Sequence, residues 1–215
     1  MAITTYSELK TAVADWLERS DLTARIPDFI TLAETKMNRE LRVRLMQART
    51  TLTVDAEYES LPADFREADS LIFTDAGVTF NCDPEPSETL ARRSVGGQTP
   101  ARPEFYALVG SQLRFYPAPD KAYSAELTYY QKAAALSDAA PTNWILTNHP
   151  DAYLYGALAE AGPYLRDPEA LAIYRTSFKA ALAAIKADQK VDAGRLRSDL
   201  PAFSRRHRYS IMSDR

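Results

Sequence analysis

Asn143-Trp144-Ile145-Leu146-Thr147-Asn148-His149-Pro150 opens the stretch, running to Ile185, that decides the fold of this chain. Thr147 or Asn148 is suited to cap a helix, and Pro150 near the first turn removes no helical hydrogen bond. Apolar residues then recur at spacings of three and four, at Leu154, Ala157, Leu158 and Ala161. This spacing predicts a helix with one apolar face.

A second helix is predicted directly after the first. Gly162-Pro163 interrupts the periodic pattern, and Asp167-Pro168-Glu169 restarts it with a cap followed by a proline. The stripe then consists of Leu171, Tyr174, Phe178, Ala181, Leu182 and Ile185, and Gly194 is a candidate stop. Two amphipathic helices joined by a short connection normally fold back antiparallel, so we expect a helical hairpin.

The first 47 residues predict two more helices. Thr5 and Glu8 have the spacing of a capping box, and Pro27 lies early in a second, longer helix. The apolar stripes consist of Tyr6, Leu9, Val13, Trp16 and Leu17, and of Ile26, Ile30, Ala33, Met37, Leu41 and Leu45. Lys36, Arg39 and Arg42 form a basic row on the other side, which we interpret as a solvated face. A surface for a partner or for nucleic-acid phosphates is the alternative.

Between residues 48 and 132 the period changes from helical to alternating. Asp75-Ala76-Gly77 separates two strand-like runs and Gly110-Ser111 separates two more, so two hairpins are predicted. A further strand alternates from Tyr123 to Tyr130. Residues 83–103 hold four prolines and two glycines, which predict a loop. The tyrosines of this segment are expected to pack on sheet faces rather than to bind a ligand.

These patterns together predict an α+β fold: a helical bundle of about four helices with a small antiparallel β insertion and an extended C-terminal tail. Residues 1–47 and 143–189 would form the helical core, and residues 48–132 an inserted β-sheet subdomain. Residues 190–215, which we call the arm, would be an extended C-terminal arm.

Composition excludes several classes of protein. The chain has 215 residues, 46% of them hydrophobic, which is enough to bury a core. No run approaches the roughly 20 apolar residues of a membrane span, and no secretory signal is visible at the N-terminus. The single cysteine, Cys82, excludes an internal disulfide and fits synthesis in a reducing compartment.

Charge is distributed unevenly along the chain. The formal net charge is −3, yet the arm holds seven Lys or Arg residues against three acids, and residues 1–189 hold 19 against 26. A basic tail on an acidic body suggests a segment that interacts with a partner.

Residues that could perform chemistry are few. His149 and His207 lie in no metal-binding spacing, and Cys82 with His149 is a poor candidate for a nucleophile and base. Paired acids such as Asp64 with Glu67 and Asp83 with Glu85 are expected to be solvated. No nucleotide-binding glycine motif is present. We therefore expect no enzyme, no cofactor and no metal.

The arm is the better candidate for a functional site. Cations for steering alternate with apolar anchors for affinity, as in a segment that orders on binding a partner. The candidate residues are Arg195, Arg197, Leu200, Phe203, Arg205, Arg206, Arg208, Tyr209, Ile211 and Met212. Two alternatives remain open: a disordered end without a partner, and a nucleic-acid-binding module that uses this basic tail with Lys36, Arg39 and Arg42.

The order of the parts is familiar. A long helix reads Ile26-Pro27-Asp28-Phe29-Ile30-Thr31-Leu32-Ala33-Glu34 through Asn38-Arg39-Glu40-Leu41-Arg42, and a strand insertion follows it. Asn143-Trp144-Ile145-Leu146 and His149-Pro150-Asp151-Ala152-Tyr153-Leu154-Tyr155-Gly156-Ala157-Leu158 come next. This arrangement resembles the head–tail adaptor (connector) proteins of tailed bacteriophages, especially those of short-tailed phages. The similarity covers the helical parts well and the sheet loosely.

The resemblance implies a structural protein of the virion, located at the head–tail junction and made in the host cytoplasm. It implies a ring, commonly of twelve copies, that binds the portal protein and a tail or nozzle protein. DNA would only pass through the lumen, and no membrane is involved. By its position, the arm would reach out to the portal. Some relatives have been credited with cell-wall-degrading activity, such as cleavage of peptidoglycan, but no motif here supports carrying that over.

Overall fold

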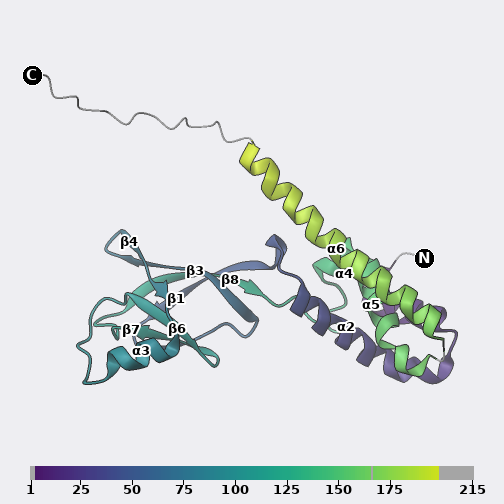
Figure 1. Ribbon diagram of the computed structural model, residues 1–215, viewed down its shortest axis with the longest axis horizontal. Helices are drawn as coiled ribbons and strands as arrows, with labels where there is room; N and C mark the ends of the chain where they lie inside the picture. The colour runs from purple at the N-terminus through teal and green to yellow at the C-terminus, as the bar shows by residue number, and fades with distance from the viewer. Residues whose placement is uncertain (1–2, 166, 199–215) are drawn as a thin grey trace, which may run out of the picture.

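A computed structural model of the protein describes residues 3–165 and 167–198. These residues form two lobes joined at one junction (Figure 1). The helical lobe comprises α1, α2, α4, α5 and α6, and the β lobe comprises eight strands and α3. Each lobe has its own cluster of buried hydrophobic residues, so each has a core of its own.

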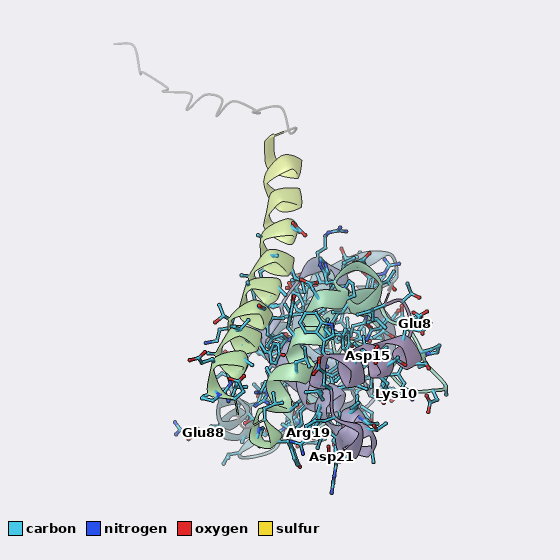
Figure 2. The ribbon with its side chains drawn as sticks, turned by 90° about the vertical axis from the view of Figure 1, so that its right-hand side faces the viewer. Glu8, Lys10, Asp15, Arg19, Asp21 and Glu88 are labelled. Carbon is cyan, nitrogen blue, oxygen red and sulfur yellow. The ribbon has the colours of Figure 1, made fainter. Side chains whose placement is uncertain are left out.

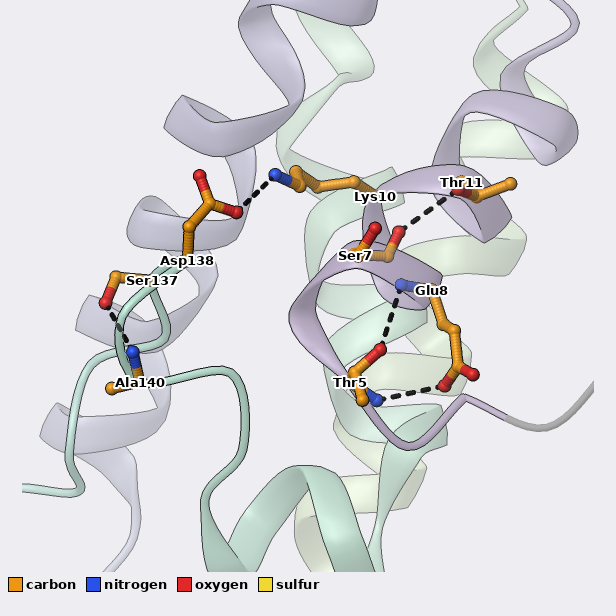
Figure 3. A network of polar contacts seen from close by, with 8 residues as sticks. All are labelled: Thr5, Ser7, Glu8, Lys10, Thr11, Ser137, Asp138 and Ala140. Carbon is orange, nitrogen blue, oxygen red and sulfur yellow. Dashed lines mark hydrogen bonds and ion pairs between the residues drawn. The ribbon is translucent and has the colours of Figure 1, made fainter.

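The N-terminal helices begin where the sequence predicts. The N–H of Glu8 donates to Thr5 Oγ1 (3.3 Å) and the N–H of Thr5 donates to Glu8 Oε2 (3.0 Å), which confirms the capping box (Figure 3). α1 spans Tyr6–Leu17, and a 3₁₀ turn (Ser20–Arg25) leads into α2, which spans Ile26–Glu40. Because α2 ends at Glu40, Leu45 lies beyond the helix and is exposed, unlike the rest of the expected stripe.

α4 (Trp144–Asn148) and α5 (Pro150–Glu160) follow the β lobe in the sequence. Thr147 and Asn148 lie inside α4, and α5 begins after His149 without a side-chain cap hydrogen bond, so the expected cap at Thr147 or Asn148 is wrong. α4 itself is capped by Asn143, whose Oδ1 accepts the N–H of Leu146 (2.9 Å). α5 packs against α1, α2 and α6. It therefore buries residues all around its axis and not on one face only: Ala152, Tyr153, Leu154, Gly156, Ala157, Leu158 and Ala159.

α6 spans Pro168–Ser198, 31 residues and about 46 Å at 1.5 Å per residue. Asp167 Oδ1 accepts the N–H groups of Glu169 (2.9 Å) and Ala170 (3.1 Å), which confirms the predicted cap. The predicted stripe is confirmed in its last four residues, Phe178, Ala181, Leu182 and Ile185, which are buried, whereas Leu171 and Tyr174 are half-buried. The expected stop at Gly194 is wrong, because the helix continues through this residue to Ser198.

The β lobe contains two four-stranded sheets. The first sheet is fully antiparallel and has the order β1-β8-β3-β4, and the second has the order β2-β7-β6-β5 with β5 parallel to β6. The strands are β1 (Gln47–Val54), β2 (Tyr58–Ser60), β3 (Phe65–Asp75), β4 (Val78–Asn81), β5 (Asp83–Pro84), β6 (Phe105–Val109), β7 (Gln112–Tyr116) and β8 (Tyr123–Gln131).

Both predicted hairpins are confirmed. Ala76 and Gly77 join β3 to β4 with φ angles of 47° and 83°, and Gly110 joins β6 to β7 with a φ of 61°. A two-residue connection with both φ angles positive matches the twist of the strands it joins. The predicted packing of the tyrosines is confirmed for Tyr106, Tyr123 and Tyr129, which are buried, whereas Tyr116 and Tyr130 are half-buried and Tyr58 is exposed.

The two sheets share one core. Phe73 of the first sheet meets Phe115 of the second edge-on, with ring centroids 5.7 Å apart, and both are fully buried. α3 (Ser87–Ser94) packs on β6 and β7 through the buried Leu90. The second sheet therefore lies between the first sheet and α3.

The expected fold class is wrong in its proportions. The described residues form six α-helices and two sheets of four strands each, and not a bundle of about four helices with a small insertion. Residues 83–103, read as a loop from their prolines and glycines, contain β5 and α3. These are the parts that complete the second sheet and cover it. The division into helical core, inserted subdomain and arm stays a prediction.

Gly156 is the point at which three helices approach one another. A Cβ added there would lie 3.0 Å from Ala33 Cβ of α2 and 3.0 Å from Phe178 Cε2 of α6. Gly156→Ala is therefore expected to lower the free energy of unfolding by about 1–2 kcal/mol, despite the better helix propensity of alanine. Chemical denaturation followed by circular dichroism measures this.

Gly194→Ala is the matched control, since Gly194 lies inside α6. This control should leave the free energy of unfolding unchanged or raise it by up to about 1 kcal/mol. Equal effects of the two substitutions would contradict the close approach at Gly156.

Candidate functional site

The residues predicted for the partner-binding arm lie at and beyond the end of α6. Arg195 and Arg197 belong to its last turns. The other candidates lie outside the described residues: Leu200, Phe203, Arg205, Arg206, Arg208, Tyr209, Ile211 and Met212. The structure therefore describes residues 190–198 of the arm, which form the end of α6.

α6 packs on the helical lobe through residues up to Ile185. Ile185 is 1% exposed. From there the helix continues for 13 residues, about 20 Å, to Ser198. In both Figure 1 and Figure 2 this second half rises away from the other helices. The end of α6 therefore lies well away from the other helices.

The return connection from the β lobe, residues 133–143, is held against the helical lobe; we call it the strap. The N–H of Tyr6 donates to the Pro141 carbonyl (2.7 Å), and Lys10 Nζ lies 2.8 Å from Asp138 Oδ1 (Figure 3). Farther up the strap, the N–H of Ala133 donates to Asn38 Oδ1 (2.8 Å). α1 and α2 thus hold the strap along its length.

Glu34 is a buried acidic residue on α2 at the centre of this arrangement, 7% exposed. Its Oε1 accepts the N–H of Leu136 in the strap (2.8 Å) and the hydroxyl of Tyr153 on α5 (3.0 Å). Asn143 Nδ2 in turn donates to the Tyr153 hydroxyl oxygen (2.6 Å). Burial raises the pKa of the Glu34 carboxyl, and these two donors partly oppose that rise. Burial and the nearby Glu34 charge raise the pKa of Tyr153.

The outgoing connection, from α2 to β1, is fixed by arginines. Arg66 of β3 donates to the carbonyl of Arg39 (2.9 Å) and to that of Leu41, at the C-terminal end of α2. Those carbonyls lack helical partners and carry the negative end of the helix dipole, so a guanidinium suits the position. Arg42 lies 3.2 Å from Glu67 and 4.7 Å from the Tyr130 ring centroid. Hydrogen bonds and ion pairs therefore hold both connections between the lobes in place.

The basic row does not form a free cationic surface. Lys36 pairs with Glu160 of α5, and Arg42 pairs with Glu67 as described. Arg39 instead lines a groove of about 520 Å³ between α2, α5 and α6, together with Lys36, Arg175 and Lys179 and the acids Glu40 and Glu160. The groove is therefore mixed in sign with an excess of two cations.

The residues considered for catalysis do not converge. Cys82 lies in the core of the β lobe, whereas His149 precedes α5 in the helical lobe. Burial raises the pKa of the Cys82 thiol to about 12, so it is protonated at neutral pH. In the described part of the chain, no three His, Cys, Asp or Glu side chains gather to hold a metal ion.

Three of the four paired acids have partners within the chain, and the fourth, Asp83, is exposed. Asp64 Oδ1 accepts the Tyr129 hydroxyl (3.0 Å), and Glu67 pairs with Arg42. Glu85 lies 3.2 Å from Arg93 of α3. These carboxylates therefore hold elements together within the chain.

Sequence reasoning missed the two residues that fix the junction. Glu34 has a detectable signal, because it shares the spacing of the buried residues Ile30, Ala33 and Met37 on α2. An acid on an apolar stripe indicates a buried hydrogen-bond acceptor. Arg66 carries no such signal, since its partners are backbone carbonyls that only the folded chain brings near.

The family described as SU10 adaptor protein matches residues 4–201, almost the whole chain. The chain belongs to this family. No curated protein matches it.

The SU10 adaptor family is a family of phage head–tail adaptors, so the resemblance inferred from the helical segments is confirmed. Membership assigns the adaptor a structural role among phage head and tail proteins, as a component of the virion. Among the helices that the structure describes, none has both the length and the apolar composition needed to cross a membrane.

Glu34 gives a testable account of how the strap of the adaptor is held. Glu34→Ala removes the acceptor of Leu136 N–H and of the Tyr153 hydroxyl, which leaves buried donors unpaired. We expect a loss of about 1–3 kcal/mol in the free energy of unfolding. Glu34→Gln keeps an acceptor oxygen and should cost less. Equal losses in the two variants, measured by denaturation at neutral pH, would contradict this role.

The difference in stability between Glu34→Gln and the wild type should depend on pH. The folded-state pKa of Glu34 is raised, so its contribution is most favourable below the unfolded pKa and is lost as pH rises through the folded pKa. The stability of Glu34→Gln relative to the wild type should therefore increase from pH 4 to pH 8. A difference that stays constant or falls over that range would contradict a buried, raised carboxyl.

Proposed function

We propose that copies of this adaptor assemble into a ring of twelve that binds the portal protein and connects the capsid to a tail or nozzle protein. DNA passes through the lumen of this ring. Membership of a head–tail adaptor family supports the location. Ring assembly agrees with the uneven distribution of charge, because an acidic body and a basic arm suit contacts between different faces of neighbouring molecules.

The observation that carries the role of the arm is the projection of α6. α6 is anchored by the buried residues Phe178, Leu182 and Ile185, and its last turns, up to Ser198, project from the other helices (Figure 1). The arm has a net charge of +4 from seven basic and three acidic residues. Its cations steer the approach to an acidic partner, and its apolar residues supply the buried contact.

The alternative of a nucleic-acid-binding module is less well supported. Two of the three cations in the basic row are paired with acids of the same chain, Lys36 with Glu160 and Arg42 with Glu67. The body carries 26 acids against 19 basic residues over positions 1–189, which repels phosphates. The groove of about 520 Å³ contains two acids among its cations.

Deletion of residues 199–215 tests the arm. The shortened adaptor keeps every described residue, so we expect an unchanged thermal unfolding curve together with loss of co-sedimentation with portal rings. Full-length adaptor is the positive control, and a gel shift with random duplex DNA tests the alternative. Undiminished co-sedimentation of the shortened chain would refute the role of the arm. Tight binding of the full chain to duplex DNA would favour the nucleic-acid module.

Charge reversal within the arm separates electrostatic steering from apolar anchoring. Replacement of Arg205, Arg206 and Arg208 by Glu should weaken binding to the portal and make it less sensitive to salt, because attraction between opposite charges is screened. The matched control replaces the same residues by Lys, which keeps the charge. Titrations at several salt concentrations measure both quantities. A reversed variant with the wild-type affinity and salt dependence would contradict the steering.

A further inference from the structure

The first sheet of the β lobe has two open edges. β1 is one edge, eight residues long, and pairs with β8 alone. β4 is the other edge and pairs with β3 alone (Figure 1). Within the described residues, no backbone hydrogen bond reaches the outer side of either strand. β1 contains no proline, glycine or lysine, the residues that commonly protect an edge strand from pairing.

The direction of the outward backbone groups of β1 follows from the ladder. The Leu71 carbonyl accepts the N–H of Cys82 (3.3 Å), so Leu71 directs its backbone groups toward β4. Leu127, opposite Leu71, therefore faces β1, where it is opposite Thr50. Because successive residues of a strand face opposite sides, Thr51 directs its N–H and carbonyl away from the sheet.

The number of strands decides how a second copy can join. Four strands alternate in direction from β1 to β4, so β1 and β4 run antiparallel to each other. A copy placed beside β4 in the same orientation presents its β1 there, and the new pair is antiparallel again. We propose that neighbouring subunits of the adaptor pair β4 of one copy with β1 of the next, so that the first sheet continues from subunit to subunit.

The side chains at the two edges suit this contact. Val78 of β4 is 66% exposed, although it shares a sheet face with Phe80, which stacks on the core residue Phe73. On β1, Leu52 is only partly buried and packs against the same core. Pairing the edges covers the open margin of the core with apolar side chains from both copies.

Charge at the edges is also complementary. Arg49, near the start of β1, pairs with Glu126 of its own chain (3.2 Å) yet is 71% exposed, and Asp83 is exposed just after the end of β4. Antiparallel pairing brings the start of β1 to the end of β4, and so brings these opposite charges to the same end of the contact. The contact joins two different faces and therefore repeats head to tail, as a closed ring requires.

The second sheet offers no equivalent contact. Its edges are β2 and β5, which have three and two residues. β5 is parallel to β6, so a head-to-tail copy would have to add β2 in a parallel arrangement. This inference rests on the ring proposed above, and it names the surfaces by which neighbouring subunits of that ring would contact each other.

Two substitutions in the full chain remove one edge each. Thr51→Pro deletes an outward N–H of β1, and Val78→Lys places a charge on the inner face of β4. Each variant should be monomeric by light scattering and by negative-stain microscopy, under conditions in which the wild type forms rings. Val95→Lys is the matched control, because Val95 is 81% exposed and lies outside both edges; it should form rings.

Mixing the two variants tests the head-to-tail geometry. Thr51→Pro keeps β4 and Val78→Lys keeps β1, so an equimolar mixture has one intact contact per pair and should form dimers that grow no further. Hydrogen exchange gives a second reading: the amides of residues 47–54 should exchange more slowly in wild-type rings than in Val78→Lys. This reading, with Val95→Lys, decides the matter if circular dichroism shows Thr51→Pro to be unfolded.

The outcomes separate the contact from the ring. Rings of Val78→Lys, or folded variants whose mixture stays monomeric, would overturn the edge pairing and leave the ring proposal standing. A wild type that stays monomeric alone and with portal rings would overturn both.

Discussion

One buried carboxylate determines how this chain returns from its β lobe. Glu34 accepts a backbone N–H from the strap and the hydroxyl of Tyr153 on α5, so a single acceptor joins α2, α5 and the segment that enters α4. Withdrawing an acid from water costs free energy, and hydrogen bonds to it offset that cost only where their geometry is fixed. Asn143 fixes it, because its amide donates to Tyr153 while its oxygen caps α4. The start of the helical hairpin and the end of the β lobe are therefore set together.

The outgoing connection, from α2 to β1, is held by a different kind of hydrogen bond. There, Arg66 of β3 supplies the donors and the end of α2 supplies the carbonyls. A guanidinium has several N–H groups in one plane, so one side chain reaches both carbonyls. The junction between the lobes is thus polar, whereas each lobe is held by its own hydrophobic core.

Local signals in the sequence predicted the elements better than their arrangement. The capping box at Thr5, the cap at Asp167 and the turn at Ala76-Gly77 depend on a few neighbouring residues, and all three are confirmed. α5 was read as amphipathic because alanines and Gly156 look neutral in a periodicity, yet small residues are what allow three helices to pack around it. The packing of the two sheets on one shared core could not be predicted for a related reason. Phe73 and Phe115 lie 42 positions apart in the sequence, and no local pattern in the two hairpins shows that their rings meet between the two sheets.

The candidate site was only partly accessible to the same reasoning. Composition pointed to a basic arm, but glycine preference placed the end of its helix too early, at Gly194. One glycine inside a helix costs only about 1 kcal/mol relative to alanine, which is less than the helix-forming residues around it can supply. The strand edges were invisible, because an edge is defined by the strand that is missing beside it, and only the order of the whole sheet reveals which strand that is.

The open strand edges and the projecting helix lie on different lobes, which suggests a reason for the division of the chain into two lobes. The β lobe has the open edges, and the helical lobe has the helix that carries the arm. For the proposed ring, contacts to neighbouring subunits and to the portal then lie on separate cores, and strain in one core is not transmitted through the other. The polar ties at Glu34 and Arg66 keep the two lobes in register. The reactive groups considered above have structural roles. The Cys82 thiol is buried, and the carboxylates of Asp64, Glu67 and Glu85 bind side chains of their own chain. What the described residues offer to other molecules is therefore shape, backbone edges and charge, which are the means by which a structural adaptor acts.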